Sequence, residues 1–98
     1  MKLQEIILAV KEKHLSKDQL ENYRDDLANV AAMMQLEIAD LEKMEALYFL
    51  SERLETDIAT KRAWKATKEG QRLIELEHYY KAAQTILSSL KSRLYNMY

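Results

Sequence analysis

The stretch LIELEHYYKAAQTILSSLKSRLYNM, residues 73–97, decides the fold because its apolar residues recur every seven positions. Two such series run through almost four heptads: Leu73, Tyr80, Leu87 and Leu94 form one, and Leu76, Ala83, Leu90 and Met97 form the other. This spacing is typical of a helix that packs along another helix in a coiled-coil-like seam. We therefore expect one long helix over about residues 57–97.

Small residues continue this seam toward the start of the expected helix. They are Ala59, Ala63, Ala66 and Gly70. Small side chains let two helices approach closely. Gly70 is the single glycine of the chain, and a glycine inside a helix costs about 1 kcal/mol relative to alanine. It could therefore mark a kink instead.

A second long helix is expected over about residues 17–55. Ser16 can cap its start, and Gln19 follows three residues later, as in a capping box. The apolar residues that follow have helical spacing: Leu20, Tyr23, Leu27, Val30, Met34, Ile38 and Leu41. These residues form the face that we expect to pack against the helix over 57–97.

The two long helices are expected to join through a turn at about residues 55–60. Thr56, Asp57 and Thr60 lie there, and Thr and Asp favour helix caps over helix interiors. A turn at this place leaves two arms of similar length, which predicts an antiparallel α-hairpin. Because no proline or glycine forces the turn, a helix that runs through to Gly70 is the alternative.

A short amphipathic helix is expected over about residues 2–14. Its apolar residues share one face: Leu3, Ile6, Ile7 and Val10. A helix this short is marginal in isolation, so it must dock on the rest of the chain. His14 would lie at its end, where a cation suits the helix dipole. The sequence thus predicts a single all-α domain over residues 1–98, with a short N-terminal helix and a long hairpin.

The second long helix carries more apolar surface than one partner helix can cover. A second stripe runs along it and into the turn: Met33, Leu36, Met44, Leu47, Leu50, Leu54 and Ile58. The short first helix is expected to cover part of this stripe, and other copies of the chain the rest. Tyr79, Tyr95 and Tyr98 lie off the main seam and are further candidates for oligomer contacts. We therefore predict a homo-oligomer that forms a helical bundle.

Composition argues against several function classes. The chain has no cysteine and one glycine, which excludes thiolate chemistry and a glycine-rich phosphate loop. Its two histidines have no convincing spacing to a nucleophile, so we expect no enzyme activity. Glu75 and His78 have the Glu-x-x-His spacing of di-iron bundles, but a second such motif is missing, so we expect neither metal nor cofactor. No apolar run is long enough to span a membrane, and we expect a cytoplasmic protein.

One group of residues suggests a binding site. Lys61, Trp64, Lys65, Lys68 and Arg72 have the spacing of a single helix stripe. An aromatic ring beside several cations could stack a base while the cations bind phosphates. Alternatively, acids of the second helix at Glu52, Glu45 and Asp40 could neutralise the cations, with Trp64 covering the end of the hairpin.

Charge is distributed unevenly along the chain although the net charge is −1. Residues 1–55 hold 12 acidic and 7 basic residues, whereas residues 56–98 hold 4 acidic and 8 basic ones. We favour pairing of an acidic helix with a basic helix inside the hairpin. A basic surface for an anionic partner is the alternative.

Three segments carry a resemblance to a group of known proteins. The chain resembles the sequences of small helical accessory proteins encoded by tailed bacteriophages over about residues 60–95. The segments that carry this resemblance are RAWKATKEG at 62–70, KAA at 81–83 and LKSRL at 90–94. The resemblance implies a protein of the host cytoplasm that works by binding, in replication, recombination or inhibition of host defence. Some anti-defence proteins of this kind are helical oligomers that sequester cyclic nucleotides.

Three functions follow as hypotheses. The first is a homo-oligomeric binding protein without enzyme activity that inhibits or modulates a host or phage protein. The second is a sponge for a small anionic ligand, such as a cyclic nucleotide, at the cluster around Trp64. The third is a nucleic-acid-binding accessory, which the net charge of −1 disfavours because phosphate binding usually needs a broad basic surface.

Overall fold

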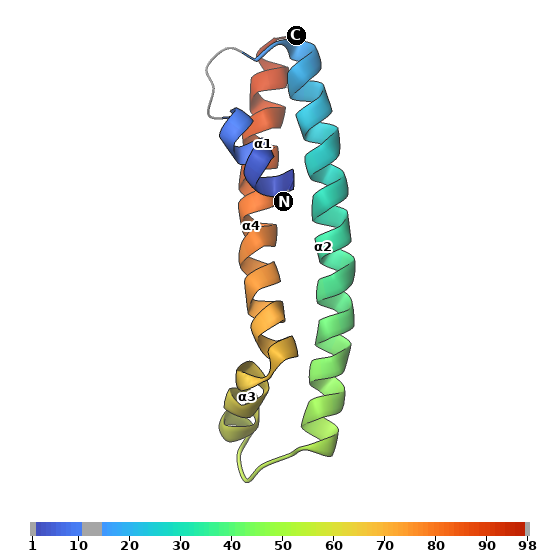
Figure 1. Cartoon of the computed structure of the whole chain (residues 1–98), viewed down its shortest axis with the longest axis vertical. Coiled ribbons are helices and arrows are strands. Elements are labelled where there is room, and N and C mark those ends of the chain that lie inside the picture. Colours follow the sequence, from blue (N-terminus) through green and yellow to red (C-terminus); the bar gives the residue numbers. More distant parts are fainter. Residues whose placement is uncertain (1, 11–14, 98) are drawn as a thin grey trace. The chain divides into compact units, whose positions relative to one another are not determined.

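The computed structural model describes residues 2–10 and 15–97, and these residues form four helices (Figure 1). The helices are α1 (Lys2–Val10), α2 (Lys17–Ser51), α3 (Asp57–Ala66) and α4 (Lys68–Tyr95). No strand occurs within these described ranges, which confirms the expected all-α class. The expected end of the first helix at about residue 14, together with His14 and Tyr98, lies outside the described residues.

The helices divide between two compact units. The first unit holds residues 1–33 and 80–98, and the second holds residues 34–79. The long helices α2 and α4 each contribute a segment to both units, whereas α1 belongs to the first and α3 to the second.

In the first unit, a reciprocal pair of hydrogen bonds fixes the start of α2. The Gln19 backbone N–H donates to the Ser16 hydroxyl at 3.2 Å, and the Ser16 backbone N–H donates to the Gln19 side-chain oxygen at 2.9 Å. Each bond satisfies a donor that the first turn of a helix leaves without a backbone partner. The predicted capping box and helix start are confirmed.

The core of the first unit comes from one face of each of its three helix segments. Its buried apolar residues are Leu3, Ile6 and Val10 of α1, Leu20, Leu27 and Ala31 of α2, and Ala83, Leu90 and Leu94 of α4. Most of these positions follow the periodicity read from the sequence. Ala31 is buried in place of the expected Val30, and the heptad residues Tyr80 and Leu87 are only half-buried. Met97 lies after the end of α4 at Tyr95 and is exposed.

In the second unit, α2 ends at Ser51, and the chain turns through residues 52–56 before α3 begins. The turn therefore lies a few residues before the expected 55–60, and the alternative of a continuous helix is wrong. The Thr56 hydroxyl accepts a 3.0 Å hydrogen bond from the Ala59 backbone N–H and so caps α3. Thr60 is fully buried. Its hydroxyl donates to the Thr56 carbonyl at 2.9 Å and accepts from the Leu54 backbone N–H at 3.1 Å.

The helix expected over 57–97 is broken at Thr67, so the prediction of one continuous helix is wrong. Thr67 caps both helices that meet there. Its backbone N–H donates to the Trp64 carbonyl at 3.0 Å and closes α3, and its hydroxyl accepts from the Gly70 backbone N–H at 3.0 Å and opens α4. The Gln71 side-chain amide also donates to the Lys65 carbonyl.

Gly70 makes room for this break. Its φ is not positive, so glycine is not needed here for an unusual backbone conformation. Glycine is needed because there is no space for a side chain. A Cβ at residue 70 would clash with the Trp64 carbonyl oxygen, and it would lie 2.8 Å from the Trp64 carbonyl carbon. The glycine therefore lets the first turn of α4 pass directly against the last turn of α3.

The break also changes which residues of α3 are buried. Because Thr67 has extended backbone angles, φ −74° and ψ 160°, the residues of α3 are out of phase with those of a helix that continued α4. The inward face of α3 thus carries Thr60 and Trp64, each one residue after the expected Ala59 and Ala63. The two alanines are half-buried and Ala66 is exposed, so the small-residue seam is wrong at Ala66.

Replacing Gly70 with alanine should destabilise the protein. In an ordinary helix interior this change gains about 1 kcal/mol. Here the added methyl group meets the backbone of α3, and overpacking of this kind costs about 1–3 kcal/mol. Thermal unfolding followed by circular dichroism should show a lower Tm. The reverse change at exposed Ala32 measures the helix propensity alone, and a G70A variant that gains stability by that amount would contradict the close contact.

Replacing Thr60 with valine should weaken the turn between α2 and α3. Valine keeps the shape of threonine but removes both hydroxyl hydrogen bonds and leaves the Leu54 N–H without its acceptor. The expected loss in the free energy of unfolding is about 1–3 kcal/mol, measured by urea denaturation. Thr85→Val is the matched control, because that hydroxyl donates to the Lys81 carbonyl on an exposed face. Equal losses for both variants would rule out a special role for Thr60.

Candidate functional site

Trp64 lies in the core of the second unit, which argues against a base-stacking ring and favours the alternative in which Trp64 covers the end of the hairpin. Its side chain is only 3% exposed. The Tyr48 ring of α2 packs against it, with ring centroids 5.5 Å apart and ring planes inclined by 55°. Tilted aromatic pairs of this kind stabilise a core beyond the area that they bury. The break at Thr67 places Trp64 on the buried face of α3.

Lys61 and Lys65 remain exposed on α3, one turn apart on either side of Trp64. They line a hollow of about 270 Å³ together with Glu45 of α2 and Glu77 of α4. Two lysines and two glutamates give this hollow no net charge. An anionic ligand would therefore meet repulsion as well as attraction.

Arg72 is engaged in ion pairs. Its guanidinium donates to the Glu37 carboxylate of α2 at 2.7 Å and to Glu75 at 3.3 Å. The hydrogen bond to Glu37 raises the pKa of Arg72 above its ordinary value. Sequence reasoning expected pairing between the two helices but named Asp40, Glu45 and Glu52 as partners. Because these side chains are about half exposed, each pair contributes roughly 0–1 kcal/mol.

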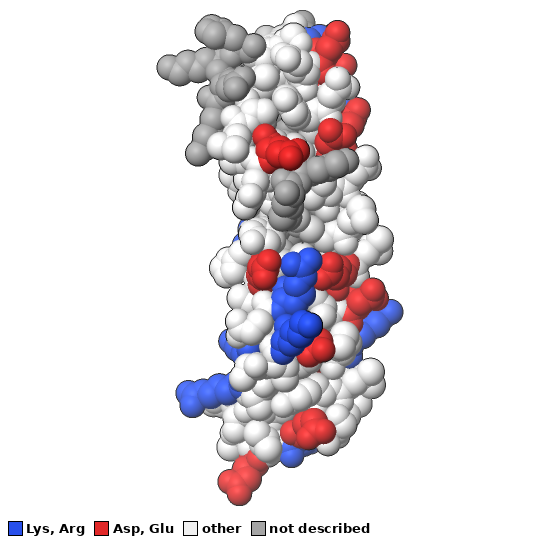
Figure 2. Space-filling model, viewed as in Figure 1, with Lys and Arg blue, Asp and Glu red and all other residues white. Residues whose placement is uncertain are grey.

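The five predicted site residues therefore do not form one stripe. Lys61, Trp64 and Lys65 line one hollow, whereas Arg72 is paired with acids and Lys68 is exposed in the first turn of α4. On the face drawn in Figure 2, the largest group of basic side chains has acidic side chains on both sides. The structure brings together three of the five predicted residues and places Glu45 and Glu77 in the same hollow.

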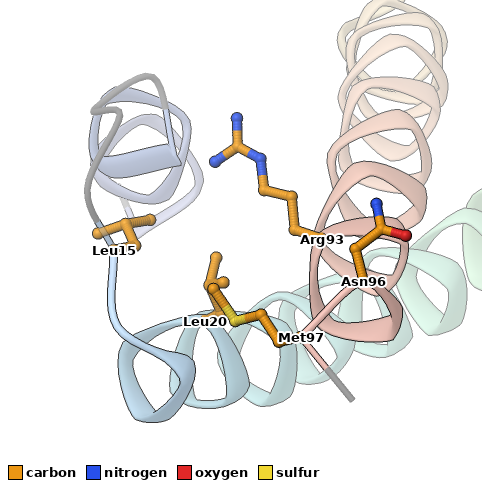
Figure 3. A pocket seen from close by; sticks show the side chains of 5 residues that line it. All are labelled: Leu15, Leu20, Arg93, Asn96 and Met97. Atoms are coloured by element: carbon orange, nitrogen blue, oxygen red, sulfur yellow. The ribbon is translucent and has the colours of Figure 1, made fainter.

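A second hollow, of about 430 Å³, lies in the first unit (Figure 3). It is lined by Leu15, Leu20, Arg93, Asn96 and Met97. Arg93 extends from α4 and donates to the Val10 carbonyl at 2.9 Å, so it satisfies an end carbonyl of α1. Sequence reasoning missed this role, because the only signal for it is one arginine near the end of a helix that has many other cations.

The predicted oligomer contacts are exposed along α2. Leu36, Leu47 and Leu50 of the second unit are 70%, 64% and 82% exposed. The neighbouring apolar residues Met44, Leu54 and Ile58 are exposed as well. The expectation that α1 covers part of this stripe is not met at Met33, which belongs to the same unit as α1 and is 72% exposed. Met33 and Tyr95 of the first unit are also exposed, and Tyr79 is half-buried.

Within residues 2–10 and 15–97, no group of three His, Asp or Glu side chains comes close enough to hold a metal ion. Glu75, from the Glu-x-x-His spacing, is paired with Arg72. Within the same ranges, no helix combines the length and the apolar character that crossing a membrane requires.

The fluorescence of Trp64 should report a buried ring. As the chain has a single tryptophan, its emission comes from one site. We expect emission at a short wavelength and weak quenching by acrylamide in the folded protein, and a shift to longer wavelength in urea. Strong quenching in the folded state, equal to that of the unfolded chain, would indicate an exposed ring and restore the stacking hypothesis.

Comparisons with known proteins add no family to this picture. The chain matches no protein-family model, no curated protein and no solved structure. The resemblance of residues 60–95 to phage accessory proteins stays a prediction. Function must be inferred from the surfaces of the helices themselves, and the exposed apolar side of α2 is the most distinctive of these.

Proposed function

We propose that this protein is a self-associating binding protein without enzyme activity. The observation that carries the proposal is the exposed apolar side of α2, which includes Leu36, Leu47 and Leu50. In the assembly, this side of α2 contacts another copy of the chain. The resemblance to phage accessory proteins suggests that the assembled form acts on a host or phage protein.

The exposed leucines support self-association through the free energy of apolar burial. Large apolar side chains scattered singly are normal on a protein surface, but several on one side of one helix are typical of an interaction surface. Burying apolar surface yields about 25 cal/mol per Å². Several leucines on one side of a helix can bury this surface against a partner that has a matching apolar helix. A second copy of the chain has such a helix, because it carries the same α2.

Capture of an anionic ligand or a nucleic acid has weaker support. Trp64 is buried and is not free to stack on a base. The two lysines beside it share their hollow with Glu45 and Glu77. With Arg72 paired to Glu37 and Glu75 as well, these cations lack the continuous positive field that phosphate binding requires.

Light scattering on the purified protein tests self-association. We expect a particle mass that is a multiple of the 11.6 kDa chain mass. The Leu47→Lys variant should lower the mass to that of one chain, because a lysine opposes burial of this surface. Leu8→Lys is the matched control, since Leu8 of α1 is 66% exposed and Leu47 is 64% exposed.

Two results would contradict the proposal. One is a wild-type protein that stays monomeric at every concentration up to the millimolar range. The other is an oligomer whose mass is unchanged in L47K but reduced in L8K, which would place the contact on α1.

A further inference from the structure

Four residues on the exposed side of α2 form an unbroken stripe. Leu36, Asp40, Lys43 and Leu47 follow one another at intervals of four, three and four residues. This is the spacing of the contact positions in a coiled coil, and it keeps all four residues on one line of the helix. All four are exposed. We call this set the α2 stripe.

The centre of the α2 stripe is charged and its ends are apolar. Neither Asp40 nor Lys43 forms an ion pair or a side-chain hydrogen bond with any residue that the structure describes. Two unpaired opposite charges between two leucines are costly to bury unless a partner supplies matching charges. The stripe therefore selects among partners and among orientations.

Orientation follows from the order of the charges. In a parallel pair of copies, each residue lies level with the same residue of the other copy, so Asp40 faces Asp40 and Lys43 faces Lys43. Such like-charge contacts are destabilising. In an antiparallel pair centred between residues 41 and 42, Asp40 faces Lys43 and Leu36 faces Leu47, because the members of each pair lie equally far from that centre.

We propose that two copies of this chain pair antiparallel along the α2 stripe. Each Asp40 then forms an ion pair with Lys43 of the second copy, and each Leu36 packs on Leu47 of the second copy. The contact is isologous, so each ion pair and each leucine pair occurs twice. The four layers span about 16 Å of helix. The inference rests on the proposed self-association and adds its partner surface, orientation and register.

The charged centre determines the register as well as the orientation. Sliding one helix by a heptad would place Asp40 or Lys43 against a leucine and leave a charge without its partner. A polar contact inside an apolar seam is the best-attested way in which helix pairs exclude wrong registers. Packing of the leucines favours association of the two helices, and the charges of Asp40 and Lys43 determine the orientation and register in which they associate.

Charge reversal tests the register by measuring the dissociation constant of the dimer. D40K sets a lysine against Lys43 twice, and K43D sets an aspartate against Asp40 twice, so each variant should dissociate at least tenfold more readily than wild type. The double variant D40K/K43D restores both pairs and should return to within about threefold of wild type. Glu42→Lys is the matched control, because it makes the same charge change on an exposed residue of α2 outside the stripe.

Cysteine cross-linking tests the orientation independently of charge. The chain has no cysteine, so introduced thiols react without competition. A mixture of L36C and L47C chains should form a mixed disulfide dimer, because an antiparallel pair brings these positions within disulfide range. Each variant alone should form much less. A parallel pair would give the opposite result, with L36C linking to L36C.

The outcomes separate this inference from the proposed function. An oligomer that D40K and K43D leave intact, or that the double variant fails to restore, would overturn the register and leave self-association standing. A monomeric wild type would overturn both. If circular dichroism shows that a charge variant has lost its helices, the cross-linking result decides.

Discussion

The contact between Gly70 and the carbonyl group of Trp64 determines the arrangement of the second unit. This contact permits the chain to leave helical geometry at Thr67 alone and to begin α4 with the next residue. Thr67 caps both helix ends. The resulting phase shift turns Trp64 onto Tyr48 and buries Thr60, whose hydroxyl holds the turn to α2. Removing the space at Gly70 would disturb the break, the aromatic pair and the turn together.

Most of the fold was accessible from periodicity and capping. The heptads of α4, the apolar face of α2 and the box formed by Ser16 and Gln19 depend on local rules, and the structure follows them. The break at Thr67 was not accessible, because it depends on a close contact between two backbones. The sequence shows Gly70 as a possible kink but gives no measure of the distance to Trp64.

The positions of the candidate site residues could be predicted only in part, for the same reason. Helix-wheel reasoning assumes one continuous helix, so an error of one residue in phase moves a side chain from the surface to the core. Trp64 shows the consequence, since its charged neighbours suggested exposure and it is buried. Exposed stripes on α2 were easier to predict. That helix is continuous from Lys17 to Ser51, so spacing along it translates directly into position.

The hydrogen bond from Arg93 to Val10 links residues that lie 83 positions apart. The nine residues of α1 are too few to hold a helix alone, so their helicity depends on the far end of α4. During synthesis, α1 leaves the ribosome before α4 and finds its docking partner only after residue 93 has emerged. Its apolar face, with Leu3, Ile6 and Val10, therefore stays uncovered until then and is available to chaperones during that time.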